Sequence, residues 1–470
     1  MKRSKKIYML LGILAVCCIA TFSVIKLEDH KEKIKNSDKI ILEISPDSVQ
    51  SLSWKYKSKA LGFHKDEKWL YDEDEAFPVD EEKINDMLKQ FEKFGVSFII
   101  EDVEDYGQYG LDNPTCTINL STKEKSYEIQ LGNYSEMDSQ RYVSIGDGNV
   151  YLVKNDPLDY FDAVLSDMID HDEIPKLDDV KEIQFKGAEA YSIAYEEDSS
   201  ISYSEDDVFI AKKDGRDLPL DTTRVKKYLK NISNLNLNDY MTYKASDEEL
   251  QKYGLNEPEL TVTVNYISKN DKGKEVSNNF VLNISRDPKE RKAAKKVDNK
   301  ESDSSDEEEI KAYARVGESK ILYKITSYDY KNLTAASYDC FRYLEAVPAD
   351  FEDIYKIDIS LEDADYTITS DKRLNKRAYY YQGEELETTD LKKALENLKA
   401  DKFTDEQPTQ KKEIGLKVYL DNKNYPEIQI QLYRYDGTYC LAVIDGKPVS
   451  LIKRSNVVDL IEAVHAIVLN

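Results

Sequence analysis

The sequence predicts an α+β protein in which an N-terminal transmembrane helix precedes three related repeats, each a largely antiparallel sheet packed on one main helix. An uncharged, mostly apolar run of 19 residues, Ile7 to Ile25, follows a short basic segment. One pattern, a short amphipathic helix followed by alternating strands, then occurs three times along the chain. The 34 tyrosines among 470 residues favour a strand-rich fold, because aromatic side chains pack well on pleated surfaces.

The apolar run is long enough to cross a membrane once. As a helix, Ile7 to Ile25 spans roughly 28 Å at ~1.5 Å per residue, and the hydrocarbon core of a bilayer is about 30 Å thick. Because cations stay on the cytoplasmic side, residues 1–6 form a cytoplasmic stub and residues 7–25 the membrane anchor. Residues 26–39 are then a linker, and the bulk of the chain lies outside the cell membrane. The cations before the run are Lys2, Arg3, Lys5 and Lys6.

Two other interpretations of this run are a cleaved signal peptide and a lipoprotein signal. Signal peptides have a shorter apolar core of ~7–15 residues and an A-x-A cleavage site, and neither feature is present. Lipoprotein signals require a small residue before the modified cysteine, but Val16 precedes Cys17. An uncleaved anchor therefore explains the run best.

The three repeats cover residues 40–175, 176–348 and 349–470. Asp80 and Asp221 are good N-caps for the main helices of the first two repeats, because a short carboxylate accepts from the free N–H groups of the first turn. Apolar residues recur at helical spacing in all three repeats, so that each helix has one apolar face for a sheet to cover. These residues are Ile84, Leu88 and Phe91; Val225, Tyr228, Leu229 and Ile232; and Leu391, Ala394, Leu395 and Leu398.

A Tyr-Gly-Leu turn follows the main helix in the first two repeats. Glycine permits a positive φ in this turn, and the proline three residues later restricts how the chain leaves it. The third repeat has a weaker copy around Gly415, which lacks the proline. We interpret this motif as structural. Its residues are Tyr109, Gly110, Leu111 and Pro114 in the first repeat, and Tyr253, Gly254, Leu255 and Pro258 in the second.

Strictly alternating strands follow each turn and end in closing hairpins. Cys116, Ile118 and Leu120 alternate with polar residues, which is typical of a half-buried strand. Hairpin turns are predicted at 146–148, 317–318 and 445–446, each followed by a short helical tail. The sequence therefore predicts the same α+β unit three times.

A charged insert interrupts the second repeat at residues 286–309. It is basic at first and acidic later, and almost nothing in it is apolar. Such a segment cannot offset its ordering entropy, so we predict a disordered loop. A tolerated insertion is the simpler interpretation, and a docking segment is the alternative.

The search for chemistry predicts no catalytic, cofactor-binding or metal-binding residue. None of the four histidines has a partner at zinc-site spacing, and nucleophile elbows and phosphate-binding glycine loops are absent. The cysteines outside the anchor, Cys116, Cys340 and Cys440, are widely spaced. The acidic clusters lack the glycine-punctuated spacing of a calcium loop. The net charge of −25 argues against a nucleic-acid partner.

The anchor, the strands that contain Trp54 and Trp69, the main helix and the Tyr-Gly-Leu turn together resemble a bacterial family known as domain of unknown function 4340. The resemblance implies a membrane-anchored extracytoplasmic protein, often associated with ABC-transporter accessory components of the gliding-motility type. It implies no catalytic residues.

These observations lead us to expect a non-enzymatic accessory or scaffold protein of a bacterial envelope complex. Its expected partners are the lipid bilayer, through residues 7–25, and other envelope or ABC-transporter proteins. An alternative is an extracytoplasmic ligand-binding protein for a cell-wall glycan or an exported solute. A divergent envelope hydrolase is a third, weaker interpretation.

Overall fold

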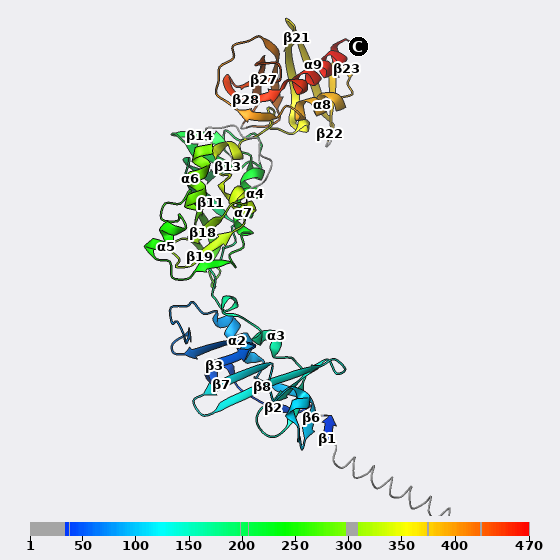
Figure 1. Cartoon of the computed structure of the whole chain (residues 1–470). Coiled ribbons are helices and arrows are strands. Elements are labelled where there is room, and N and C mark those ends of the chain that lie inside the picture. The colour runs from blue at the N-terminus through cyan, green and yellow to red at the C-terminus, as the bar shows by residue number, and fades with distance from the viewer. Residues whose placement is uncertain are drawn as a thin grey trace, which may run out of the picture. The chain divides into compact units, whose positions relative to one another are not determined.

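The computed structural model describes residues 33–36, 38–197, 199–204, 206–297, 309–373, 376–423 and 425–469. Within these ranges the chain forms three antiparallel β-sheets, each with its own helices (Figure 1). The predicted α+β class is therefore confirmed. The predicted anchor, residues 7–25, lies outside the described residues.

The first sheet has ten strands in the order β1-β6-β10-β9-β8-β7-β3-β4-β5, and β2 also pairs with β6. Its strands are β1 (Lys33–Asn36), β2 (Ile40–Leu42), β3 (Val49–Tyr56), β4 (Lys59–Lys65), β5 (Trp69–Tyr71), β6 (Phe94–Glu101), β7 (Cys116–Thr122), β8 (Ser126–Ser135), β9 (Gln140–Ser144) and β10 (Val150–Val153). Its helices are α2 (Glu81–Lys89), α3 (Leu158–Phe161) and the 3-10 helices η1 (Pro46–Ser48), η2 (Tyr106–Tyr109) and η3 (Leu165–Asp167).

The second sheet has nine strands in the order β14-β13-β12-β11-β16-β17-β18-β19-β15. These are β11 (Val180–Lys186), β12 (Ala190–Tyr195), β13 (Phe209–Lys213), β14 (Arg216–Pro219), β15 (Tyr240–Thr242), β16 (Leu260–Lys269), β17 (Glu275–Arg286), β18 (Ala312–Val316) and β19 (Leu322–Ile325). Its helices are α4 (Thr222–Ser233), α5 (Asp247–Lys252), α6 (Pro288–Val297), α7 (Ser327–Thr334) and η4 (Tyr338–Phe341).

The third sheet also has nine strands, in the order β23-β22-β21-β20-β25-β26-β27-β28-β24. These are β20 (Ile354–Leu361), β21 (Ala364–Arg373), β22 (Lys376–Tyr381), β23 (Glu384–Glu385), β24 (Ala400–Phe403), β25 (Lys412–Leu420), β26 (Glu427–Arg434), β27 (Tyr439–Ile444) and β28 (Lys447–Lys453). Its helices are α8 (Thr389–Glu396), α9 (Arg454–Val468) and η5 (Phe351–Asp353).

The strands of all three sheets are connected in the same order. The strands before the main helix run outward from the middle of the sheet, in the first repeat from β3 to β5. The strand after the helix crosses to the opposite edge and pairs with the last strand: β6 with β10, β15 with β19 and β24 with β28. The remaining strands form a meander that fills the space between. The three predicted repeats thus share one antiparallel topology.

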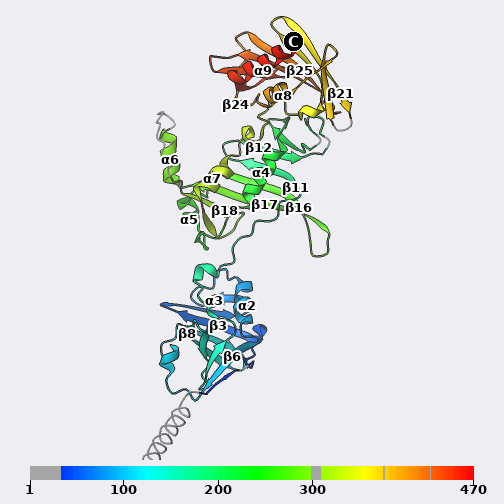
Figure 2. The same cartoon turned by 90° about the vertical axis from the view of Figure 1, so that its right-hand side faces the viewer.

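The main helices lie where the apolar periodicity predicts. In α4, Asp221 accepts from the backbone N–H groups of Thr223 and Arg224, which satisfies two otherwise free donors. The apolar face of α4 rests on the second sheet (Figure 2), where Tyr228 contacts Phe185 with ring centroids 5.6 Å apart. In the third repeat, α8 and α9 pack on the sheet and share one core with its strands. The buried helix residues of that core include Leu391, Leu395, Val457, Leu460 and Val464.

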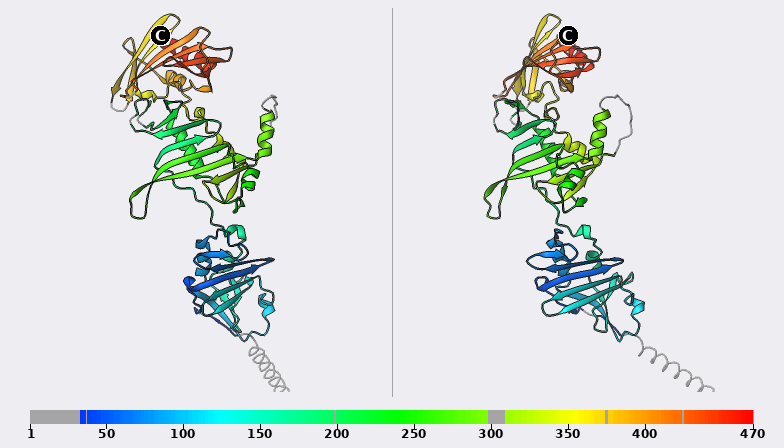
Figure 3. Two further views of the ribbon diagram at one scale, coloured as in Figure 1. Left: turned by 90° about the vertical axis from the view of Figure 1, so that its left-hand side faces the viewer. Right: turned by 60° about the vertical axis from the view of Figure 1, so that its left-hand side comes forward.

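The structure corrects the first half of the disordered insert that was predicted over residues 286–309. Arg286 ends β17, and the chain then forms helix α6, which projects away from its sheet (Figures 2 and 3). Asp287 caps this helix by accepting from the backbone N–H of Lys289 at 2.8 Å. Arg291 donates to the Glu257 carbonyl at 3.0 Å. These polar contacts order the first turns without apolar burial, and residues 298–308 of the insert lie outside the described residues.

A second correction concerns the linker predicted over residues 26–39. Lys33–Asn36 forms strand β1, which pairs antiparallel with β6. The reason is that β6 leaves a row of free backbone groups at the edge of the sheet, and a neighbouring strand satisfies them. Of the helices in the described ranges, none has both the length and the apolarity needed to span a bilayer.

The described residues form two compact units, one up to His171 and one from Asp172 onward. The division falls close to the first predicted repeat boundary at residue 175. Inside the second unit, the second and third repeats contact each other: the rings of Tyr203 and Tyr425 pack with centroids 4.5 Å apart. The Asn422 amide also donates to the Tyr203 carbonyl at 2.8 Å.

Candidate functional site

The Tyr-Gly-Leu turns of the first two repeats each cover a small hydrophobic cluster at one end of a sheet. Tyr109 and Leu111 pack with Ile100 of β6 and with Val150 and Leu152 of β10. The second copy is similar, but Tyr253 and Leu255 pack on β18 and β19, the strands that correspond to β9 and β10. That cluster contains Ala245, Tyr253, Leu255, Tyr313 and Leu322.

Both glycines of this motif are required by backbone conformation and by packing. Gly110 has φ +70° and Gly254 has φ +73°, a region that glycine adopts without strain. A Cβ atom at Gly110 would lie 2.4 Å from the Asn133 side chain, and one at Gly254 would lie 2.9 Å from Ser285 Oγ. Pro114 and Pro258 each stand two residues before the strand that follows, β7 or β16. The motif therefore holds a covering segment on its sheet.

Gly415 does not belong to such a turn, and the structure corrects this prediction. Gly415 lies inside β25, opposite Ser360 of β20 and Gln431 of β26. The connection from β24 to β25 is short and contains no Tyr-Gly-Leu turn. Instead, tyrosines cover Leu441, Val443 and Leu451 on the face that lies opposite the main core. These tyrosines are Tyr433, Tyr435 and Tyr439.

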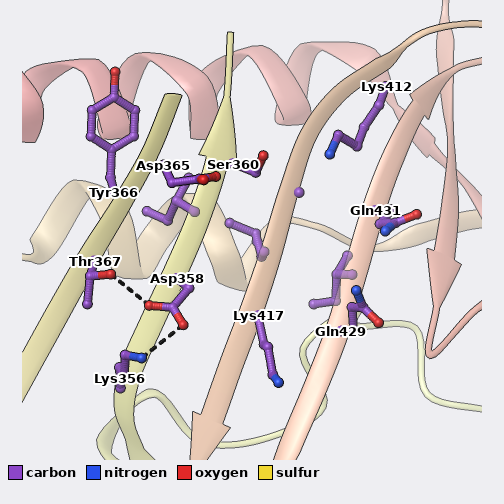
Figure 4. A pocket seen from close by; sticks show the side chains of 14 residues that line it. Lys356, Asp358, Ser360, Asp365, Tyr366, Thr367, Lys412, Lys417, Gln429 and Gln431 are labelled. Atoms are coloured by element: carbon purple, nitrogen blue, oxygen red, sulfur yellow. Dashed lines mark hydrogen bonds and ion pairs between the residues drawn. The ribbon is translucent and has the colours of Figure 1, made fainter. Parts of the chain in front are cut away.

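Gly415 instead lines an open polar groove on the third sheet. Figure 4 shows the side chains of this groove. The groove has a volume of about 500 Å³ and crosses four strands. Because residues paired across an antiparallel sheet point to the same face, its lining side chains form two rows. One row is Thr367, Asp358, Lys417 and Gln429, and the next is Asp365, Ser360, Gly415 and Gln431.

Two lysines of the groove are neutralised by neighbouring carboxylates. Lys356 Nζ lies 2.9 Å from Asp358 Oδ2, and Lys417 Nζ lies 3.0 Å from Glu427 Oε2. Partial burial by itself would raise the pKa of Asp358, but hydrogen bonds from Lys356, Thr367 and Tyr419 together hold it below its usual value. The hydrogen bond to Glu427 raises the pKa of Lys417. Each of these two ion pairs is neutral overall.

Two oppositely charged groups of the groove have no such partner. The Lys412 ammonium and the Asp365 carboxylate make no side-chain hydrogen bond or ion pair with any described residue. Figure 4 shows them on opposite sides of Ser360. The groove can thus offer a cation, an anion and neutral hydrogen-bonding groups to one ligand.

Two of the three described cysteines are poor nucleophiles or metal ligands. Cys116 and Cys440 are fully buried, and burial raises the pKa of each thiol to about 12. Both thiols are therefore protonated at physiological pH, whereas nucleophilic attack and metal binding use the thiolate. Across the described ranges, His, Cys, Asp and Glu side chains form no group arranged to hold a metal ion.

The sequence pattern did not reveal the groove residues, because they alternate with apolar residues as the solvent-facing side chains of any half-buried strand do. The available signal was Gly415 in the interior of a strand pattern, where glycine often marks close approach of a ligand or backbone. The pairing that brings Asp365, Ser360, Gly415 and Gln431 into one row joins positions that are up to 66 residues apart in the chain.

The comparisons with known proteins identify a family. Searches of curated proteins and of solved structures returned no significant match. A family model matches two overlapping regions, residues 69–247 and 213–418. The first match begins at Trp69 of β5 and the second at Lys213 of β13, in each repeat shortly before the main helix. Each match then continues into the next repeat. Together the two matches cover well over half of the chain, which therefore belongs to the family described as Domain of unknown function (DUF4340).

Proposed function

We propose that this protein is a membrane-anchored, extracytoplasmic, non-enzymatic accessory or scaffold protein of a bacterial envelope complex, with an ABC transporter as its partner. The observation that carries the proposal is the tandem arrangement of three sheets of one topology behind a basic and then apolar N-terminal segment. Repeated domains offer several similar surfaces on one chain, which suits a protein that holds others together.

The internal use of charged side chains supports a structural role. Arg141 and Asp156 form an ion pair at 2.8 Å in the first repeat. In the second, Glu259 accepts from the backbone N–H of Arg286 and from Tyr330, both at 2.9 Å. Such groups stabilise the repeats and are not available for chemistry.

The topology can be tested by protease treatment of intact, wall-stripped cells. We expect protease to remove everything after about Lys26 while the first residues stay protected, because the cations before Ile7 hold the N-terminus inside. Detergent-permeabilised cells serve as the control in which both sides are cut. An ectodomain that is protected in intact cells and cut only after permeabilisation would contradict the proposed topology.

The partner can be tested by cross-linking in intact cells, followed by purification of the tagged full chain and mass spectrometry. The matched control carries an unrelated apolar span in place of residues 7–25 and the same extracytoplasmic part. Co-purification of a permease and its ATPase with both proteins would support an accessory role of the repeats. If no envelope protein is enriched above cells that lack the tag, the proposal is wrong.

The alternative function is ligand binding, for a cell-wall glycan or an exported solute. The polar groove over Gly415 favours it, since about 500 Å³ is within the range of small-molecule sites. Co-sedimentation of the purified protein with isolated cell wall tests the glycan version. Retention that is lost when Gly415→Val fills the groove would favour this alternative over the scaffold.

A further inference from the structure

We infer that the groove over Gly415 binds a short peptide with a free amino end and a free carboxyl end, held between Asp365 and Lys412. This inference goes beyond the proposed accessory role, because it assigns a ligand class to one site in the third repeat. It rests on the glycine, on the position of Lys412, and on the charges that remain unpaired.

Neither conformation nor packing requires glycine at position 415. Its φ is outside the positive region, and a Cβ atom there would meet no atom closer than 3.6 Å. Glycine in a strand interior weakens the strand and often marks close approach of a ligand. At Gly415 its consequence is a hollow between Ser360 and Gln431, which any larger side chain would fill.

A β-bulge places Lys412 over this hollow. The register of β25 against β26 shifts between Lys412 and Ile414, and bulges of this kind re-aim side chains next to functional sites. As a result, Lys412 Nζ is the atom nearest to the position where a Gly415 Cβ would stand, at 3.6 Å. The lysine thus reaches back along its own strand to the glycine.

The unpaired charges match the two ends of a zwitterion. Asp365 lies on β21 and Lys412 on β25, and β20 runs between these strands. The two strands are therefore about 10 Å apart, which is two strand spacings, and the Lys412 side chain reaches back along β25 to the row that contains Asp365. An extended chain covers ~3.3–3.6 Å per residue, so about three residues fill this distance. The Ser360 hydroxyl lies on β20, between these strands, and can hydrogen-bond a peptide group between the two ends.

Other ligand classes fit the charge pattern less well. A simple anion would use Lys412 alone and a metal ion would use Asp365 alone, so each would leave the opposite charge without an ionic partner. A neutral oligosaccharide would leave Lys412 and Asp365 without ionic partners. A peptide with both ends free uses both charges at once.

The test is a ligand-observed NMR titration of the purified full chain with tri-alanine. The comparison ligands are N-acetyl-tri-alanine, tri-alanine amide and chitotetraose. We expect tri-alanine to bind and each blocked end to weaken binding about fivefold, because both contacts are exposed ion pairs. Lys412→Gln and Asp365→Asn should each weaken tri-alanine binding by a similar factor. Lys412→Gln should have no further effect on the amide, and Asp365→Asn none on the N-acetyl form.

The Gly415→Val variant tests the inference with a substitution that we expect to leave the fold intact. The added side chain fills the hollow, and β-branched residues suit strands, so we expect tri-alanine binding to be lost while the melting temperature does not fall. Lys423→Gln, outside the groove, is the matched control and should bind as the unmodified protein does. The inference is wrong if tri-alanine does not bind, if end-blocked peptides bind equally well, if chitotetraose binds in preference, or if Gly415→Val still binds.

Discussion

Among single residues, charged side chains differ most in what they contribute to stability, because the fold buries a few of them and leaves most in water. Arg141 Nε lies 2.8 Å from both oxygens of Asp156 and its guanidinium also donates to the Gly132 carbonyl at 2.7 Å. The two side chains are only 10% and 14% exposed, whereas Lys89 and Asp86 of an otherwise similar pair are 52% and 58% exposed. Only the first pair is shielded from solvent screening.

Asp156→Ala should therefore lower the free energy of unfolding of the first unit by about 3–5 kcal/mol, because it leaves a buried guanidinium without its partner. Asp86→Ala removes an exposed pair and should cost under ~0.5 kcal/mol. Urea unfolding of the two variants measures both values. Equal losses would show that the Arg141 site is as open to water as the surface.

The glycine of the Tyr-Gly-Leu turn gives a second prediction at this scale. Gly110→Ala imposes a positive φ on a residue with a side chain and brings its Cβ against Asn133. Gly146→Ala is the matched control, since Gly146 has φ +80° and no atom within 4 Å of the added Cβ. We expect a loss of about 1 kcal/mol for Gly146→Ala and an additional 1–3 kcal/mol for Gly110→Ala. Melting curves that shift equally would mean that Asn133 moves aside freely.

The burial of the Cys116 thiol leads us to predict how the free energy of unfolding changes with pH. Burial raises the pKa of Cys116 from 9.0 to about 12, so the folded protein holds this proton more tightly than the unfolded chain. The contribution to stability is fully present below about pH 9 and is lost as the pH rises toward 12, by up to ~1.4 kcal/mol per pH unit. Urea unfolding across this window measures it. Cys116→Ala should show a shallower decline, and an unchanged slope would contradict the assignment.

Individual helices differ in how their first turns are held, although the sequence predicts all three main helices by the same periodicity. Asp221 accepts from two backbone N–H groups at the start of α4. Thr388, in the corresponding position of α8, makes no side-chain cap. Burial of the apolar face holds α8 in place, through Leu391 and Leu395.

Asp221→Ala should accordingly cost about 1 kcal/mol of the free energy of unfolding of the second unit. Thr388→Ala should change it by less than ~0.5 kcal/mol, because no cap is removed. Chemical unfolding followed by circular dichroism compares the two variants. A larger loss for Thr388→Ala would mean that its hydroxyl caps α8 after all.

At the scale of the whole molecule, the described part of the chain divides into two compact units, after His171, although this part contains three sheets. The second and third repeats belong to one unit because residues such as Tyr203 and Tyr425 pack together, and the pKa of Tyr203 is raised to about 12 by burial there. Units with separate cores unfold separately when few contacts join them.

Thermal unfolding should therefore show two transitions. Asp156→Ala should lower the melting temperature of only one transition, and Asp221→Ala that of only the other, because the two residues lie in different units. Differential scanning calorimetry of the full chain measures both. A single transition that shifts with either variant would show that the units unfold together.

The sequence by itself determined the α+β class, the three repeats, the main helices and the closing hairpins, because these follow from local periodicity, caps and turn residues such as Asp221 and Gly110. Tertiary structure alone decided where strands pair. Lys33–Asn36 joins the first sheet because it pairs with β6. Polar contacts hold the first turns of α6 in place. Gly415, which was expected in a turn, instead lies in a paired strand and lines the groove. Such long-range pairing depends on free backbone groups and side chains far apart in the chain, which no local pattern records.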